Sequence, residues 1–179
     1  MSDRTPWHFW AMRGLFVALS GYILFLQLLP VATSGSGWTA PDLLTCLVFA
    51  WVSRRPEYAP VILVAAVVVM ADLLLNRPPG LLAALTILVT ERFRRRRNKL
   101  HMQNVVLEWA YAGAGIAALY FLNRFALAIL MTPNAPLLPS FSQLLSTILF
   151  FPAVLFLSSA VFGITRVSGA ELEAGGQRV

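Results

Sequence analysis

The sequence predicts an all-α integral membrane protein built as a bundle of six transmembrane helices, and three observations support this. Hydrophobic residues make up 58% of the 179 residues and charged residues only 12%, a composition typical of polytopic membrane proteins. The hydrophobic residues gather in runs that are separated by basic or proline-containing breaks. The basic residues fall almost entirely on alternate breaks, as the positive-inside rule requires of a multi-pass protein.

The apolar runs differ in length. At about 1.5 Å per residue, the first, third, fifth and sixth can cross a hydrocarbon core of roughly 30 Å with modest adjustment at their flanks. The second and fourth are short, and we expect them to span because neighbouring helices cover their ends. The six runs cover residues 14–32, 41–52, 58–75, 80–90, 105–131 and 141–164.

The basic residues set the expected orientation. With six spans and a cytoplasmic N-terminus, only Arg77 and Arg124 of the 14 basic residues fall outside the inner loops. If the second or fourth run were re-entrant, the arginines that follow it would lie on the outer side, against the positive-inside rule. We therefore expect a polytopic membrane domain over residues 1–168 and a short cytoplasmic tail over residues 169–179, with both termini inside the cell.

An acidic residue, Asp72, stands inside the third apolar run. A carboxylate in hydrocarbon is costly, so Asp72 should face protein or water rather than lipid. The run then stops at Asn76 and Arg77, followed by Pro78, Pro79 and Gly80. Tandem prolines cannot continue a helix, so this stretch predicts a tight hairpin between two spans.

Counting residues from the inner flanks places several polar side chains in one layer, in the outer half of the bilayer. We predict that these residues form a structural cluster, because pairing an aspartate with an arginine offsets the cost of burying both and holds the second, third and fifth helices together. The alternative is a small polar pocket for a substrate, as in transporters with broken helices. The members of the predicted cluster are Asp42, Asp72, Asn76, Arg77 and Arg124.

Catalysis and metal binding find little support in the sequence. His8 and His101 are the only histidines and lie far apart, and Cys46 is the only cysteine, so a His-rich or Cys-rich metal site is not expected. No phosphate-binding loop or nucleophile elbow occurs. We expect no enzymatic activity and no cofactor. Nucleic acid is not an expected partner either, because basic residues in a membrane protein first indicate cytoplasmic loops.

A dense basic run follows the fourth apolar segment. It has three interpretations: a determinant of topology, a contact for anionic lipids, and a docking surface for an acidic cytoplasmic partner. We predict that it is a cytoplasmic contact surface in addition to its topological role. The run contains Arg92, Arg94, Arg95, Arg96, Arg97 and Lys99.

Four short motifs fall at successive ends of the short spans. They are Pro41-Asp42-Leu43-Leu44, Arg54-Arg55-Pro56, the stretch from Ala71 through Arg77-Pro78-Pro79-Gly80 to Leu81, and Thr90-Glu91-Arg92. In combination, and in a chain of this size, they resemble the rod shape-determining protein family MreD. The resemblance covers most of residues 1–170.

The resemblance implies a non-enzymatic scaffold in the bacterial cell inner membrane, in the machinery that directs cell elongation, rod shape and peptidoglycan synthesis. Besides membrane lipids, the implied partners are the bitopic protein MreC, the filament protein MreB, and the glycosyltransferase RodA with its penicillin-binding transpeptidase. The family is also similar in fold to the six-helix S-components of energy-coupling-factor transporters. That similarity keeps a second function open, a membrane-embedded subunit that binds a small molecule.

Overall fold

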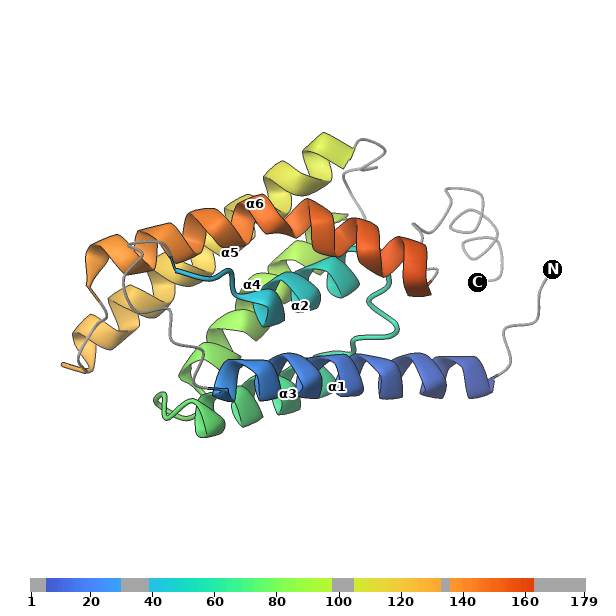
Figure 1. The fold of residues 1–179 in the computed structure, drawn as a ribbon, viewed down its shortest axis with the longest axis horizontal. Helices are drawn as coiled ribbons and strands as arrows, with labels where there is room; N and C mark the ends of the chain where they lie inside the picture. Colours follow the sequence, from blue (N-terminus) through green and yellow to red (C-terminus); the bar gives the residue numbers. More distant parts are fainter. Residues whose placement is uncertain (1–5, 30–38, 98–104, 133–135, 163–179) are drawn as a thin grey trace.

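The computed structural model describes residues 6–29, 39–97, 105–132 and 136–162. Within these ranges the chain forms six α-helices and no strand (Figure 1). The predicted tail over residues 169–179 lies outside the described residues. The helices are α1 (Pro6–Leu28), α2 (Leu43–Arg54), α3 (Val61–Leu74), α4 (Leu81–Arg97), α5 (Val105–Ile129) and α6 (Leu137–Phe162).

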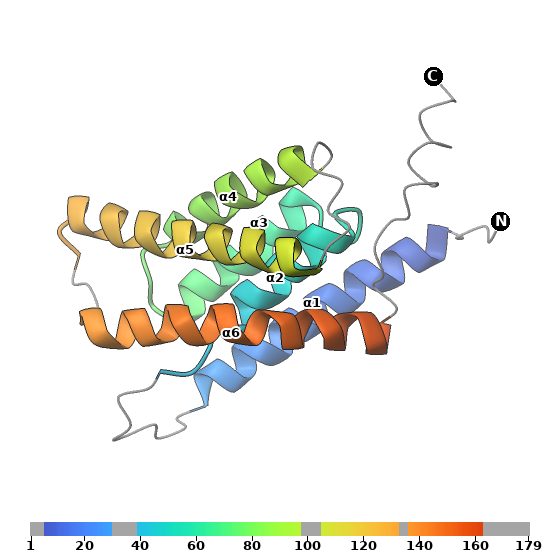
Figure 2. The ribbon, with the colours of Figure 1, turned by 90° about the horizontal axis from the view of Figure 1, so that it is seen from above.

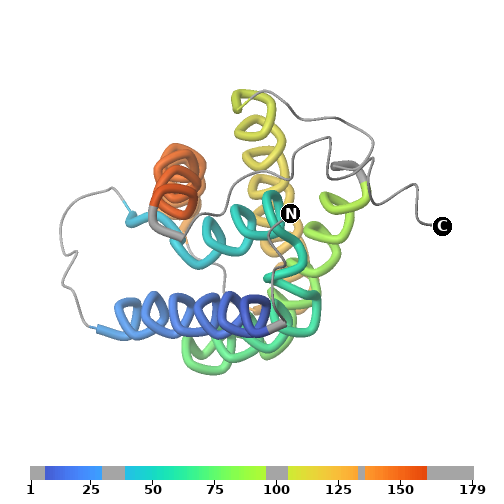
Figure 3. Tube along the Cα trace, turned by 90° about the vertical axis from the view of Figure 1, so that its right-hand side faces the viewer, coloured from blue at the N-terminus to red at the C-terminus, as the bar shows by residue number. Residues whose placement is uncertain are grey.

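The short helix α2 is the central element of the bundle. Every residue from Leu44 to Arg54 is buried, and α2 contacts α1, α4, α5 and α6. Viewed along the bundle in Figure 3, α2 lies between α1 and α6. Seen from above in Figure 2, α5 and α6 run alongside each other and are joined at one end of the bundle. A helix that is apolar on all sides, as α2 nearly is, has no solvent face and is expected inside a fold.

The composition of the helices is that of a membrane protein. Three of the described helices, α1, α5 and α6, are long and apolar enough to cross a membrane, and α2 and α3 are shorter apolar helices. At about 1.5 Å per residue, the 12 residues of α2 extend for only about 18 Å, well short of a hydrocarbon core of roughly 30 Å. The ends of α2 therefore lie among the longer helices that surround it.

The expectation that the second and fourth helices are the short ones is correct for α2 and wrong for α4. Helix α3 has 14 residues and α4 has 17. Helix α3 is shortened at its start because Pro60 occupies its N-cap position. Helix α4 continues beyond its apolar part as far as Arg97, because arginine is a good helix former and the charged turns need no apolar cover.

Glycine lets α5 approach its neighbours closely. A Cβ placed on Gly115 would lie 2.7 Å from Cε1 of Phe49 in α2, and one on Gly113 would lie 3.3 Å from Cγ2 of Ile148 in α6. The Phe49 ring is fully buried and packs edge-on against Phe93 of α4, with ring centroids 6.1 Å apart. Small residues of this kind are how membrane helices obtain close contact.

We predict that Gly115→Ala destabilises the fold, because the added methyl group must displace the enclosed Phe49 ring. The expected loss is about 1–3 kcal/mol in the free energy of unfolding, measured by thermal or denaturant unfolding in detergent. Gly21→Ala in α1 is the matched control, since its Cβ would meet nothing within 4 Å. Alanine there should be neutral or stabilising, because it is the better helix former. Equal stability of the two variants would contradict the packing argument.

Candidate functional site

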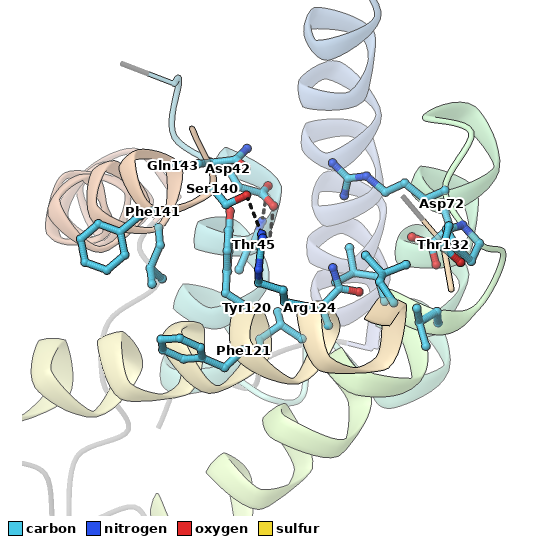
Figure 4. A pocket seen from close by; sticks show the side chains of 18 of the residues that line it. Asp42, Thr45, Asp72, Tyr120, Phe121, Arg124, Thr132, Ser140, Phe141 and Gln143 are labelled. Carbon is cyan, nitrogen blue, oxygen red and sulfur yellow. Dashed lines mark hydrogen bonds between the residues drawn. The ribbon is translucent and has the colours of Figure 1, made fainter. Parts of the chain in front are cut away.

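A cavity of about 370 Å³ opens at the end of the bundle where α2, α4 and α6 begin and where α3 and α5 end. Figure 4 shows the side chains that surround it. The volume is in the range of small-molecule sites, about 300–1,000 Å³. Its polar lining residues are Asp42, Thr45, Asp72, Asn76, Arg77, Tyr120, Asn123, Arg124, Thr132, Ser140 and Gln143.

All five members of the predicted polar cluster line this cavity: Asp42, Asp72, Asn76, Arg77 and Arg124. They come from different parts of the chain, namely the segment before α2, helix α3, the α3–α4 connection and helix α5. The residues that the sequence predicts at one depth in the bilayer thus line one cavity in the structure.

Asp72 bonds to the start of α4. Its side chain is fully buried, so it faces protein, and its Oδ2 atom accepts a hydrogen bond from the backbone N–H of Gly80 at 3.1 Å. The backbone N–H groups at a helix start have no partner within their own helix, and they carry the partial positive charge of the helix end. The Oδ1 atom of Asp72 is buried without a hydrogen-bond partner among the described residues. Asp72 therefore joins α3 to α4.

The connection between α3 and α4 closes tightly because Asn76 adopts a left-handed conformation, with φ of 52°. The Arg77 N–H donates to the Asp72 carbonyl at 2.9 Å, and the Asn76 N–H donates to the Leu73 carbonyl at 3.4 Å. This pair of bonds is a Schellman motif, which satisfies the last carbonyls of a helix. Gly80 then turns the chain into α4 at a φ of 82°, a conformation that strains other residues.

Asp42 also accepts hydrogen bonds at the start of a helix, in this case α2. Its Oδ1 accepts from the Thr45 N–H at 3.1 Å and its Oδ2 accepts from the Thr45 hydroxyl at 2.8 Å. Asp42 is the N-cap residue of α2, which is a favoured place for aspartate. Its own N–H donates to Oγ1 of Thr147 in α6 at 2.9 Å.

A row of hydroxyl groups on α6 supports the chain that enters α2. Ser142 Oγ accepts from the Thr39 N–H at 3.2 Å, and Ser146 Oγ donates to the Thr39 carbonyl at 3.1 Å. Cys46 of α2 donates from Sγ to the Thr147 carbonyl at 3.3 Å. Sequence reasoning did not identify these hydroxyl residues. The available signal was the helical spacing of Ser142 and Ser146 within an otherwise apolar segment.

Arg124 of α5 joins α6, since its Nη1 donates to Ser140 Oγ at 3.3 Å. The expected ion pair that clamps the second, third and fifth helices stays a prediction. The bonds of the aspartates and of Arg124 link α3 to α4, α2 to α6, and α5 to α6. The sequence indicates the depth of a residue but not the direction in which it points around its helix.

A buried ion pair lies at the opposite end of α2. Arg54 Nε and Glu108 Oε1 are 3.3 Å apart, and Ser53 Oγ donates to the same carboxylate oxygen at 3.2 Å. Glu108 is 4% exposed and Arg54 is 9% exposed, so this pair joins α2 to α5 away from solvent. The sequence interpretation treated Arg54 as a loop residue that reports topology, and the structure shows that it also holds two helices together.

The basic run divides into inward and outward residues. Arg94 is half-buried and donates to the Ala59 carbonyl in the α2–α3 loop. Arg92 and Arg95 are exposed, and Arg95 pairs with Glu91 one helical turn earlier at 3.2 Å. The side chains of Arg96 and Arg97 and all of Lys99 lie outside the described residues. Among the described side chains of the run, Arg92 and Arg95 are therefore the exposed ones.

The described residues contain no group of three or more His, Cys, Asp or Glu side chains that could hold a metal ion. What the cavity offers instead is a set of hydrogen-bonding groups and two guanidinium groups at the end of an apolar bundle. Comparison of the chain with known protein families, with curated proteins and with solved structures finds no match in any of the three.

Replacing Asp72 tests its role at the start of α4. We predict that Asp72→Ala lowers the free energy of unfolding by about 0.5–2 kcal/mol, the usual effect of removing a helix cap. Asp72→Asn should lose less, because the amide keeps an oxygen that can accept from Gly80. Glu91→Gln is the control, since it changes an exposed ion pair further along α4. If Asp72→Ala unfolds at the same denaturant concentration as this control, the capping role is wrong.

A double-mutant cycle tests the Arg54–Glu108 pair. Glu108→Leu should cost roughly 3–5 kcal/mol, because the buried Arg54 charge loses the Glu108 carboxylate. Arg54→Met combined with Glu108→Leu should recover much of that loss. The same cycle on the exposed Arg95–Glu91 pair should give about 1 kcal/mol or less. Additive losses at Arg54 and Glu108 would show that the two side chains are not coupled.

Proposed function

We propose that this chain is a non-enzymatic scaffold subunit of the MreD kind, embedded in the bacterial inner membrane as part of the cell-elongation machinery. The observation that supports this most directly concerns the motifs of the resemblance. Asp42 caps α2, Asp72 covers the start of α4, and the Asn-Arg-Pro-Pro-Gly stretch closes the hairpin between α3 and α4. The motif residues thus have structural roles in the fold, which is what we expect of a scaffold protein that has no catalytic site.

The proposed arrangement in the membrane has six spans with both termini in the cytoplasm. The short helices α2 and α3 would span because longer helices and buried hydrogen bonds surround their ends. The arginine-rich end of α4 then lies on the cytoplasmic side, and the cavity lies toward the outer side. This orientation follows from the positive-inside rule.

The proposed partner is a bitopic protein of the MreC kind, with MreB, RodA and its penicillin-binding transpeptidase in the same assembly. Two surfaces are available to partners. Arg92 and Arg95 are exposed on α4, and α5 exposes the small residues Ala110, Ala114 and Ala118 at helical spacing. Small residues at this spacing let a partner helix pack closely in a membrane.

A second candidate function is a membrane-embedded subunit that binds a small molecule for transport. The observation that favours it is the cavity of about 370 Å³ at the predicted outer side. A scaffold alone requires no space of this size. Mass spectrometry of the protein purified in mild detergent distinguishes the two, because a binding subunit retains a soluble molecule and a scaffold retains partner proteins.

The scaffold proposal predicts that Arg92→Gln combined with Arg95→Gln weakens recovery of the elongation partners in a pulldown from native membranes. The expected cause is loss of a cytoplasmic charge contact, with stability unchanged because both side chains are exposed. The control is Arg77→Gln, which removes an exposed positive charge at the opposite end of the bundle. Protease accessibility of a C-terminal tag checks that orientation is preserved. Undiminished recovery of every elongation partner contradicts the role of the basic run.

A further inference from the structure

The lining of the cavity carries no net formal charge. Asp42 and Asp72 contribute two carboxylates, and Arg77 and Arg124 contribute two guanidinium groups. A charged ligand would leave this end of the bundle with an excess charge, and an uncompensated charge inside an apolar structure is costly. The balance of charges therefore favours a ligand that is itself uncharged.

Several hydrogen-bonding groups of the lining have no bond within the part of the chain that the structure describes. The Asp72 side chain is fully buried, and its Oδ1 atom has no hydrogen-bond partner there. The side-chain amides of Asn76, Asn123 and Gln143 also make no hydrogen bond among the described residues. A buried acceptor without a partner is costly. Because Asp72 lines the cavity, a ligand there can supply the donor that Oδ1 lacks.

These groups match a ligand that both donates and accepts hydrogen bonds. An ionised carboxylate only accepts, whereas a carboxamide has two N–H donors and a carbonyl acceptor. A hydroxyl group fits both kinds of partner, because it carries one donor and two acceptor lone pairs. A ligand with several hydroxyl groups can therefore pair with the Asp72 carboxylate and with the amides of the lining.

The part of the lining between α5 and α6 is apolar and exposed. Phe121 and Phe141 are each 63% exposed, and Leu137 is 70% exposed. Figure 4 places the two phenylalanines on one side of the cavity and Asp72 on the other. An aromatic ring offers a large, flat apolar surface. The C–H face of a sugar ring packs on such a surface while its hydroxyl groups project from the edge of the ring.

We propose that the cavity binds an uncharged, polyhydroxylated ring, which is the chemistry of a sugar group. Its hydroxyl groups bond to Asp72, Asn123 and Gln143, and its C–H face packs on the phenylalanine side of the cavity. The volume of about 370 Å³ is in the range of small-molecule sites. The sugar comes either from a soluble glycoside or from the headgroup of a glycolipid. The proposal rests on the second candidate function, a binding subunit, and names its class of ligand.

The experiment measures binding to the full-length protein in a polyoxyethylene detergent, because maltoside detergents carry sugar headgroups themselves. Native mass spectrometry measures retention of glucosyl diacylglycerol, and of diacylglycerol and phosphatidylglycerol with the same acyl chains. Calorimetry measures binding of methyl glucoside, the soluble probe. The variants are Asn123→Leu and Gln143→Leu, which remove an amide from the lining. Gln27→Leu is the matched control, since Gln27 is an exposed amide on α1 that does not line this cavity.

We expect wild-type protein to bind the glucosyl group. Tighter binding of glucosyl diacylglycerol than of diacylglycerol identifies a glycolipid headgroup as the source, and binding of methyl glucoside alone identifies a soluble sugar. Each cavity variant should lose about fivefold in affinity for the glucosyl probe, the usual effect of removing one hydrogen bond between neutral groups. Gln27→Leu should bind as wild type does. If one cavity variant does not fold, judged by its melting temperature, the other decides.

Three results overturn the proposal. The first is glucosyl diacylglycerol that binds no more tightly than diacylglycerol, together with no binding of methyl glucoside. The second is tighter binding of phosphatidylglycerol than of the glycolipid, which indicates a site for a charged headgroup. The third is unchanged affinity for the glucosyl probe in both cavity variants, which places its site elsewhere.

The outcome is separable from the proposed functions. If wild-type protein retains a soluble molecule that is not a sugar, the sugar proposal fails and the binding function stands. Recovery of elongation partners in the pulldown tests the scaffold proposal and is independent of the glucosyl probes.

Discussion

The fold depends on one constraint: helix ends that lie inside the bundle must find hydrogen-bond partners within the protein. Hydrocarbon offers no donors or acceptors, so each open N–H group there is costly. Because α2 is only 12 residues long, its start lies among other helices, and the start of α4 packs against α3. Asp42 and Asp72 supply the acceptors at these two starts. These two aspartates thus lie where a helix starts inside the bundle.

The same constraint explains the polar contacts at the two ends of α2. At one end, hydroxyl groups of α6 bond to the extended chain before Asp42. At the other end, Arg54 and Glu108 form a buried pair between α2 and α5. Between these ends α2 packs through apolar side chains against every long helix. Its position is therefore set by polar contacts at both ends and by apolar packing along its length.

Much of this architecture is predictable from the sequence, and the missing parts have a common cause. Composition and run length predict an all-helical membrane protein. The described residues are all-helical apart from their connections, and three of the helices are long and apolar enough to cross a membrane. Residue counting predicts the polar layer that lines the cavity. Counting residues gives the depth of a residue along its helix but not the direction of its side chain around the helix axis. It therefore could not show that Asp72 bonds to Gly80 or that Arg54 pairs with Glu108. The extent of α4 was also missed, because an arginine-rich run continues a helix as well as it marks a loop.

The bond between Asp72 and Gly80 joins residues only eight positions apart, and this has a consequence for biosynthesis. A contact so local needs nothing from α1, α5 or α6, so it can form as soon as the α3–α4 hairpin has left the ribosome. One oxygen of the carboxylate then already accepts a hydrogen bond from the Gly80 N–H. In the proposed six-span arrangement, the two helices can therefore enter the bilayer as one preformed unit. The position of Asp72 in the sequence therefore allows the α3–α4 hairpin to form before the later helices are synthesised.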